Sequence, residues 1–211
     1  MQKGRPADRA YAWIRRRILG GGFAPRAHLR EQELAARIGV SRSPVRDALR
    51  RLAGEGLVAM QRDRGTYVTQ FSPAEIDEIF QLRARLEAYG AALAARRIRP
   101  PELRRLESLA ARMEKLPRSR TARFAALNND FHLGILGAAR SPRLQALLAP
   151  LISIPIVLLK HYNWQPGRVD IGRSNRDHRG LIAALRRGDA ARASARIRDH
   201  ILSRRPPAGK P

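Results

Sequence analysis

The chain has 211 residues, no cysteine and a formal net charge of +24 at pH 7. The lack of cysteine excludes disulfide frameworks and thiolate metal sites, and the positive charge favours a polyanionic partner such as nucleic acid. Residues 1–6 lead into no signal-peptide core, and the longest apolar stretch, residues 144–159, is shorter than a membrane span and contains prolines. We therefore expect a cytoplasmic protein.

Residues 29–52 have the pattern of two helices joined by a tight turn. The first helix is expected to stop at Gly39, because glycine tolerates the left-handed conformation common at helix ends. Ser41 or Ser43 can cap the second helix, and Pro44 fits its first turn. The apolar stripe of this second helix consists of Val45, Ala48, Leu49 and Leu52.

Polar residues off that stripe indicate what the second helix does; they are Arg42, Ser43, Arg46 and Arg50. Arg42 and Arg46 share one face near the helix N-terminus, the end that enters the major groove in helix-turn-helix proteins. Arginine can donate two hydrogen bonds to guanine O6 and N7. We interpret the segment as a DNA-reading helix; for an isolated arginine pair, the alternative is a solvated basic helix face.

Two short β-prone runs, residues 57–60 and 66–69, flank a charged turn that ends in glycine. This pattern predicts a β-hairpin wing whose tip can touch phosphates or the minor groove. The candidate tip residues are Arg62, Arg64 and Gly65. An ordinary solvent-exposed turn is the alternative.

From Ser72 onward the pattern is helical. Ser72 and Pro73 begin a long amphipathic helix that ends at Pro100-Pro101, and further helical patterns cover about 101–116, 121–139, 142–162, 175–187 and 190–203. We predict a mainly α protein with a winged helix-turn-helix domain at residues 1–71. An all-α bundle of about six helices is expected at 72–205, and a disordered tail at 206–211.

Three histidines of the second half can converge. Asn128 and His132 share one helix face, being four residues apart. His178 precedes and His200 follows the Gly188-Asp189 turn by a similar number of residues. In an antiparallel helical hairpin, the two residues therefore lie beside each other at the same height. Three histidines with an oxygen ligand suit Zn²⁺, Ni²⁺ or Mn²⁺, the last being the poorest match. Each histidine alone is more often an ordinary core or surface residue.

Arg83 lies on the same side as the apolar stripe of the long helix, where an arginine needs an anionic partner. Glu87, four residues later, is the structural candidate for that partner. A carboxylate effector is the functional alternative.

Residues 9–71 resemble the winged helix-turn-helix of GntR-family bacterial transcription regulators. The resemblance rests on the run Gly-Val-Ser-Arg-Ser-Pro-Val-Arg-Asp-Ala-Leu-Arg-Arg-Leu at 39–52 and Gly-Leu-Val at 56–58. It implies that Arg42 and Arg46 read bases, that Ser43 contacts a phosphate or base, and that Gly65 is the wing glycine. The chain departs from the family pattern at Pro25-Arg26, usually Pro-Gly, and at Gln32, an arginine in some relatives.

Residues 75–203 resemble the FCD ligand-binding domain of the FadR-like branch of that family, through motifs that include Asn128-(x)2-Phe131-His132, Asp177-His178 and His200-Ile201. The resemblance implies a divalent metal held by Asn128, His132, His178 and His200. It also implies a small organic acid held by the metal and an arginine, here Arg83. Asparagine in place of aspartate at 128 removes a negative charge and lowers the expected metal affinity.

Together these features predict a transcription regulator rather than an enzyme. We expect a repressor that binds a pseudo-palindromic operator as a homodimer and is released by the acid. Two alternatives stay open. One is a helical metalloenzyme fused to a DNA-binding head, although no carboxylate stands out as a general base. The other is an architectural DNA-binding protein, suggested by charge alone.

Overall fold

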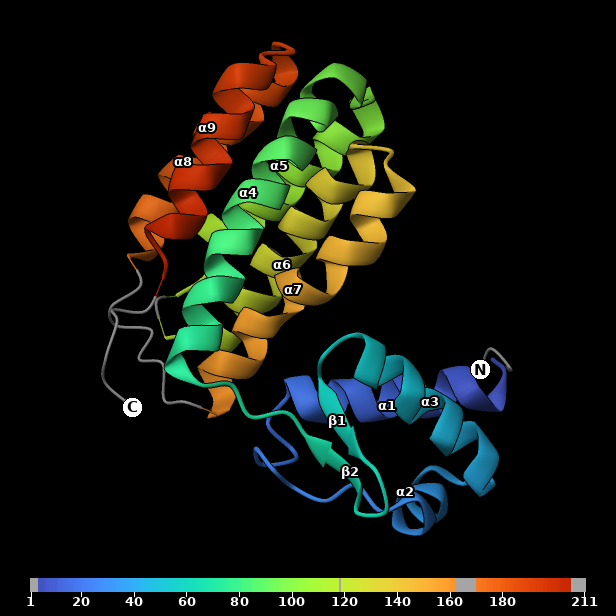
Figure 1. Ribbon diagram of the computed structural model, residues 1–211. Helices are drawn as coiled ribbons and strands as arrows, with labels where there is room; N and C mark the ends of the chain where they lie inside the picture. The colour runs from blue at the N-terminus through green and yellow to red at the C-terminus, as the bar shows by residue number, and fades with distance from the viewer. Residues whose placement is uncertain (1–3, 118, 162–169, 206–211) are drawn as a thin grey trace. The chain divides into compact units, whose positions relative to one another are not determined.

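The computed structural model describes residues 4–117, 119–161 and 170–205, but not the side chains of residues 121 and 155–161. The chain forms two compact units, divided between Phe71 and Ser72. The predicted disordered tail, residues 206–211, lies outside the described residues. Figure 1 shows the elements of each unit, and the two units are taken separately below.

The first unit consists of helices and a small hairpin (Figure 1): α1 (Pro6–Leu19), α2 (Glu31–Ile38), α3 (Arg42–Gly54), β1 (Val58–Gln61) and β2 (Gly65–Val68). The sequence analysis assigned no helix to α1, although it packs along α3 and buries Ile14 and Ile18 completely. The predicted apolar stripe of α3 is fully buried. The winged helix-turn-helix prediction is therefore confirmed for this unit.

The turn between α2 and α3 forms as expected at its glycine. Gly39 ends α2 in the left-handed conformation, with φ +73°. Ser41 occupies the N-cap position of α3, but its side chain makes no capping hydrogen bond, so that part of the prediction is wrong. The strands β1 and β2 are antiparallel, with Val58 opposite Val68 and Gln61 opposite Gly65.

The second unit is helical throughout its described residues (Figure 1): α4 (Pro73–Arg97), α5 (Pro100–Glu114), α6 (Thr121–Ala138), α7 (Pro142–His161), α8 (Ile171–Arg186) and α9 (Ala190–Leu202). Ser72 and Glu75 form a reciprocal capping box at the start of α4. Asp170 caps α8, which begins four residues before the predicted start at 175. These helices confirm the mainly α fold.

Two packing features determine how α4, α8 and α9 are arranged around the interior of this bundle. The helix α4 lies along α9, and α8 and α9 form a hairpin through Gly188, whose φ is +68°. Asp189 then caps α9 by accepting a hydrogen bond from the backbone N–H of Arg192. Phe80 and Phe131 are among the largest fully buried side chains around these helices. Among the described helices, none combines the length and apolar composition that a membrane span requires.

Candidate nucleic-acid interface and metal centre

The four predicted DNA-contacting residues of α3 are all exposed, on the face opposite its buried stripe; they are Arg42, Ser43, Arg46 and Arg50. Arg46 is held in place by Glu31 at the start of α2. Its Nε and Nη2 atoms donate hydrogen bonds to the two carboxylate oxygens of Glu31, each at 2.9 Å. Arg42 lies 3.7 Å from the same carboxylate. The two arginines predicted to contact bases thus share one acidic partner, which the sequence analysis did not identify.

The wing tip is exposed at Arg62, Arg64 and Gly65, which connect β1 to β2. Gly65 adopts φ +97°, and a Cβ at this position would lie 2.5 Å from Nε2 of His28. The His28 ring stacks on Tyr67, with ring centroids 4.8 Å apart. Only glycine combines this backbone conformation with this close approach. His28, to which the sequence analysis gave no role, therefore supports the base of the wing.

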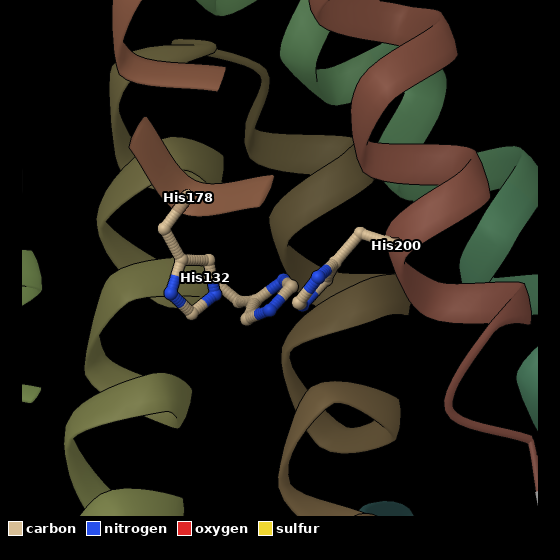
Figure 2. Close-up of side chains that lie close together, drawn as sticks. All are labelled: His132, His178 and His200. Carbon is tan, nitrogen blue, oxygen red and sulfur yellow. The ribbon is translucent and has the colours of Figure 1, made fainter. Parts of the chain in front are cut away.

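Three histidines converge inside the second unit (Figure 2). His132 comes from α6, His178 from α8 and His200 from α9, and one ring nitrogen of each lies within 4.8 Å of the others. Their exposed fractions are only 2%, 1% and 2%. The structure thus places His178 and His200, which the hairpin argument predicted to lie at the same level, next to His132.

Two carboxylates, buried Glu87 and partly exposed Asp177, orient two of the three histidines. Nδ1 of His132 donates a hydrogen bond to Glu87 on α4 at 2.5 Å, and Nδ1 of His200 donates one to Asp177 on α8 at 3.3 Å. Nε2 of His200 and both ring nitrogens of His178 are buried and have no hydrogen-bond partner among the residues that the structure describes. A carboxylate on one ring nitrogen fixes the tautomer and leaves the other nitrogen available as a ligand. Sequence spacing alone does not indicate this role of either carboxylate.

Comparison with known proteins assigns a family to both units. Residues 6–68 match the model of the bacterial regulatory proteins of the gntR family, and residues 78–203 match the FCD domain. The chain belongs to the GntR family. It is accordingly a transcriptional regulator with a DNA-binding helix-turn-helix unit and an FCD domain.

Relatives of this GntR-family chain are named as regulators or repressors. It is 29% identical over 207 residues to the repressor GlaR of Escherichia coli, covering 92% of this chain and 91% of GlaR. It is 31% identical over 140 residues to the regulator YdhC of Bacillus subtilis, covering 65% of this chain but only 62% of YdhC. A probable D-xylose utilization operon repressor of Paenarthrobacter nicotinovorans is 28% identical over 177 residues, 84% of this chain and 77% of that protein.

The fold of this GntR-family chain also matches solved structures. The structure of E. coli McbR/YncC aligns with a TM-score of 0.75 at 21% identity, covering 94% of each chain. A GntR regulator from Rhodococcus sp. RHA1 aligns with a TM-score of 0.71 at 22% identity, covering 93% of each chain. At these identities the likeness establishes the fold alone.

His178 and His200 have the protonation state that metal binding needs. Burial holds the pKa of His178 well below its ordinary value, and the neighbouring histidines and Arg204 lower it further. Burial lowers the pKa of His200 to about 4, although the hydrogen bond to Asp177 acts in the opposite direction. Both rings are therefore neutral at pH 7, and a neutral imidazole offers a lone pair to a metal.

Arg83 and Glu87 form a buried ion pair beside His132. Nε of Arg83 donates to Glu87 at 2.8 Å, and their side chains are 5% and 3% exposed. Burial alone would raise the pKa of Glu87, but the charge of Arg83 and the contact with His132 outweigh it and hold this pKa at about 2. The structural partner predicted for Arg83 is thus present.

The fourth predicted metal ligand, Asn128, lies one helical turn before His132. Its Oδ1 is buried and has no hydrogen-bond partner in the described part of the chain. Asp130, two residues before His132, is exposed. Neutral imidazole nitrogens and an amide oxygen without partners form the donor set that Zn²⁺ and similar divalent metals take in proteins. The residues present therefore fit such an ion.

We expect the metal-free protein to lose stability as the pH falls from 6.5 to 4. The pKa values of His178 and His200 are lowered in the folded state, so in this range the unfolded chain binds more protons. Each histidine should contribute a slope of up to about 1.4 kcal/mol per pH unit. Urea unfolding of chelator-treated protein between pH 7.5 and 4.5 measures this slope. The variant H200Q should show a shallower slope, and a flat profile for the wild type would contradict the expectation.

Proposed function

We propose that this GntR-family regulator is a cytoplasmic repressor that binds a two-fold operator as a homodimer and is released by a small organic acid. The observation that carries the DNA-binding part is the exposed face of α3, where Glu31 holds the guanidinium of Arg46 by two hydrogen bonds. A planar guanidinium held this way is preorganised for the bidentate recognition of guanine. Repression is supported by the names of relatives such as GlaR.

The decisive experiment is footprinting on DNA from upstream of the protein's own gene, in excess random competitor and at near-physiological salt. We expect selective protection of two half-sites spaced by whole turns of the double helix, since two-fold operators mirror two-fold proteins. Small organic acids should then release the protein when metal is present and fail to do so after chelation. Tight binding without sequence preference would instead support an architectural protein.

We propose that Asn128, His132, His178 and His200 hold a divalent ion, Zn²⁺, Ni²⁺ or Mn²⁺. The support is the burial of the three rings, their convergence within 4.8 Å and the unpartnered nitrogen atoms of His178. A bound ion would supply a Lewis-acid contact for an oxygen of the acid. The orienting carboxylates Glu87 and Asp177 both have lowered pKa values, so they are weak bases, and the metalloenzyme alternative gains no support from them.

Adding Zn²⁺ to chelator-treated protein should therefore raise its stability. An ion at 100 times its dissociation constant stabilises the folded state by about 2.7 kcal/mol. Differential scanning calorimetry with increasing Zn²⁺ measures the effect. H178Q should remove most of the metal-dependent shift. The matched variant D130N, an exposed acid on the same helix as His132, should retain it, and loss in D130N but not in H178Q would refute the assigned donor set.

At the wing, the proposed role of Arg62, Arg64 and Gly65 is contact with the DNA backbone. R64A should weaken binding to all sequences by a similar factor and reduce the slope of log affinity against log salt by about 1. Binding titrations at several salt concentrations, on operator and on random DNA, measure both. The control R123A removes an exposed arginine from the FCD domain and should leave the slope nearly unchanged. A sequence-dependent loss in R64A would indicate base contact instead.

A further inference from the structure

A second polar layer lies one helical turn from the histidine trio. Each of the three histidines has a polar residue four positions away in the chain. On α6 and α8 the pairs share a helix face, and they are Asn128 with His132 and Ser174 with His178. The third pair is His200, near the end of α9, with Arg204 in the turn that follows this helix.

The members of this layer lie on the same side of the histidines. The helices α8 and α9 are antiparallel, so a residue four positions before His178 and one four positions after His200 are displaced in the same direction. The guanidinium of Arg204 lies 5.6 Å from the ring centroid of Phe124, one turn before Asn128 on α6. Arg204 is therefore displaced from the histidines toward the same end of α6 as Asn128.

Each member of the layer carries a buried polar atom without a hydrogen-bond partner among the described residues. These atoms are Oδ1 of Asn128, Oγ of Ser174 and Nη2 of Arg204. Leaving such a group unpaired costs about 1–3 kcal/mol, and more when it is charged. Folded proteins seldom carry this cost several times at one place without a reason. Three such atoms, displaced from the histidines in the same direction, indicate a binding site for a polar ligand.

The charge of Arg204 specifies the sign of that ligand. Unlike Arg83, whose Nε contacts Glu87, Arg204 makes no ion pair within the described residues. The nearby carboxylate of Asp177 accepts the hydrogen bond of His200. The carboxylates of Asp177 and Asp170 attract the charge of Arg204, and the charge of Arg83 repels it. Nη2 of Arg204 has no hydrogen-bond partner within the described residues. An arginine with an N–H group available in this way can bind a carboxylate.

We propose that Arg204 anchors a carboxylate of the acid effector, with Ser174 beside it, and that Arg83 mainly keeps Glu87 ionised for His132. The inference rests on the proposed function, because it assumes that an organic acid binds in the FCD domain. On α6 and α8, one helical turn, about 5.4 Å, separates Asn128 and Ser174 from the histidines. The ligand class is therefore a short acid with a carboxylate at one end and a second oxygen group that reaches the histidine centre.

Titration of Zn²⁺-loaded, full-length protein with acetate, lactate, succinate and citrate tests the proposal, with calorimetry as the readout. We expect at least one acid to bind the wild type and to bind R204Q at least tenfold more weakly. R204K should be intermediate, because lysine keeps the charge but not the paired geometry. The matched control R205Q removes the next arginine, an exposed residue 3.0 Å from Asp77, and should bind the acid like the wild type.

Two further readouts separate this role from a structural one. The acid-free stability of R204Q should stay close to that of the wild type, because the substitution removes a partly buried charge that makes no ion pair within the described residues. Its Zn²⁺ affinity should stay within twofold of the wild type. Equal acid affinity in R204Q and wild type would overturn the inference and leave the proposed function intact. If no acid binds the wild type or affects its operator complex, the effector part of the proposed function fails and the inference fails with it.

Discussion

Replacing Glu87 with alanine should destabilise the FCD domain by about 3–5 kcal/mol, the usual cost of breaking a buried ion pair from one side. The change leaves the guanidinium of Arg83, 4% exposed, without its counter-charge and takes the hydrogen-bond acceptor from His132. Denaturant unfolding followed by circular dichroism measures the loss. Metal affinity should fall about 10- to 100-fold in the folded fraction, as when other orienting partners of metal ligands are removed.

Two controls isolate the buried pair. E114A breaks the ion pair of Glu114 with Arg179, which lies on the surface at 2.9 Å, and should cost less than about 1 kcal/mol. The double variant R83Q/E87Q removes both charges and should cost clearly less than the sum of the two single substitutions. Additive losses, or a loss in E87A no larger than that in E114A, would show that the two charges do not depend on each other.

Replacing Arg46 with alanine should reduce operator affinity about 5- to 150-fold and relax the preference at one base position, the effect expected for a bidentate guanine contact. Competition binding with operators substituted at single positions measures both parts. E31Q should give a smaller loss, because it keeps Arg46 but weakens the two hydrogen bonds that hold it. The control R30A removes an exposed arginine that pairs with Glu33 at 3.2 Å. If R46A binds no worse than R30A, α3 is not the reading helix.

The helix boundaries that the sequence predicted well are those with a chemical signal at the end. Ser72, Pro73 and Glu75 predict the start of α4, and the structure has the full capping box there. The start of α8 was placed too late, because residues 171–174 contain little apolar periodicity and only the cap at Asp170 indicates the helix. The helix α1 was missed although Ala10, Ile14 and Ile18 have helical spacing and are all fully buried.

The sequence predicts those parts of the candidate site that depend on residue spacing within one helix or across the α8–α9 hairpin. The level positions of His178 and His200 follow from the turn at Gly188 and the antiparallel geometry of α8 and α9. The contacts of Glu31 with Arg46, and of Glu87 with His132, join residues 15 and 45 positions apart on different helices. Such contacts depend on how the helices pack, and the sequence pattern carries no signal of that packing. Arg204 was missed because it lies in an arginine-rich stretch at the end of α9 that reads as solvent-exposed.

The hairpin of α8 and α9 also makes this domain more sensitive to insertions than to substitutions. Each residue added to a helix advances the chain by about 1.5 Å and rotates all later residues of that helix by about 100°. One residue inserted between Asp189 and His200 would keep every proposed ligand in the sequence and yet turn His200 and Arg204 away from their partners. Substitutions on the outer faces leave this register untouched. The length of this segment is therefore under stricter constraint than most of its amino acids, and a related chain with an insertion there should lack the site even if it keeps all its histidines.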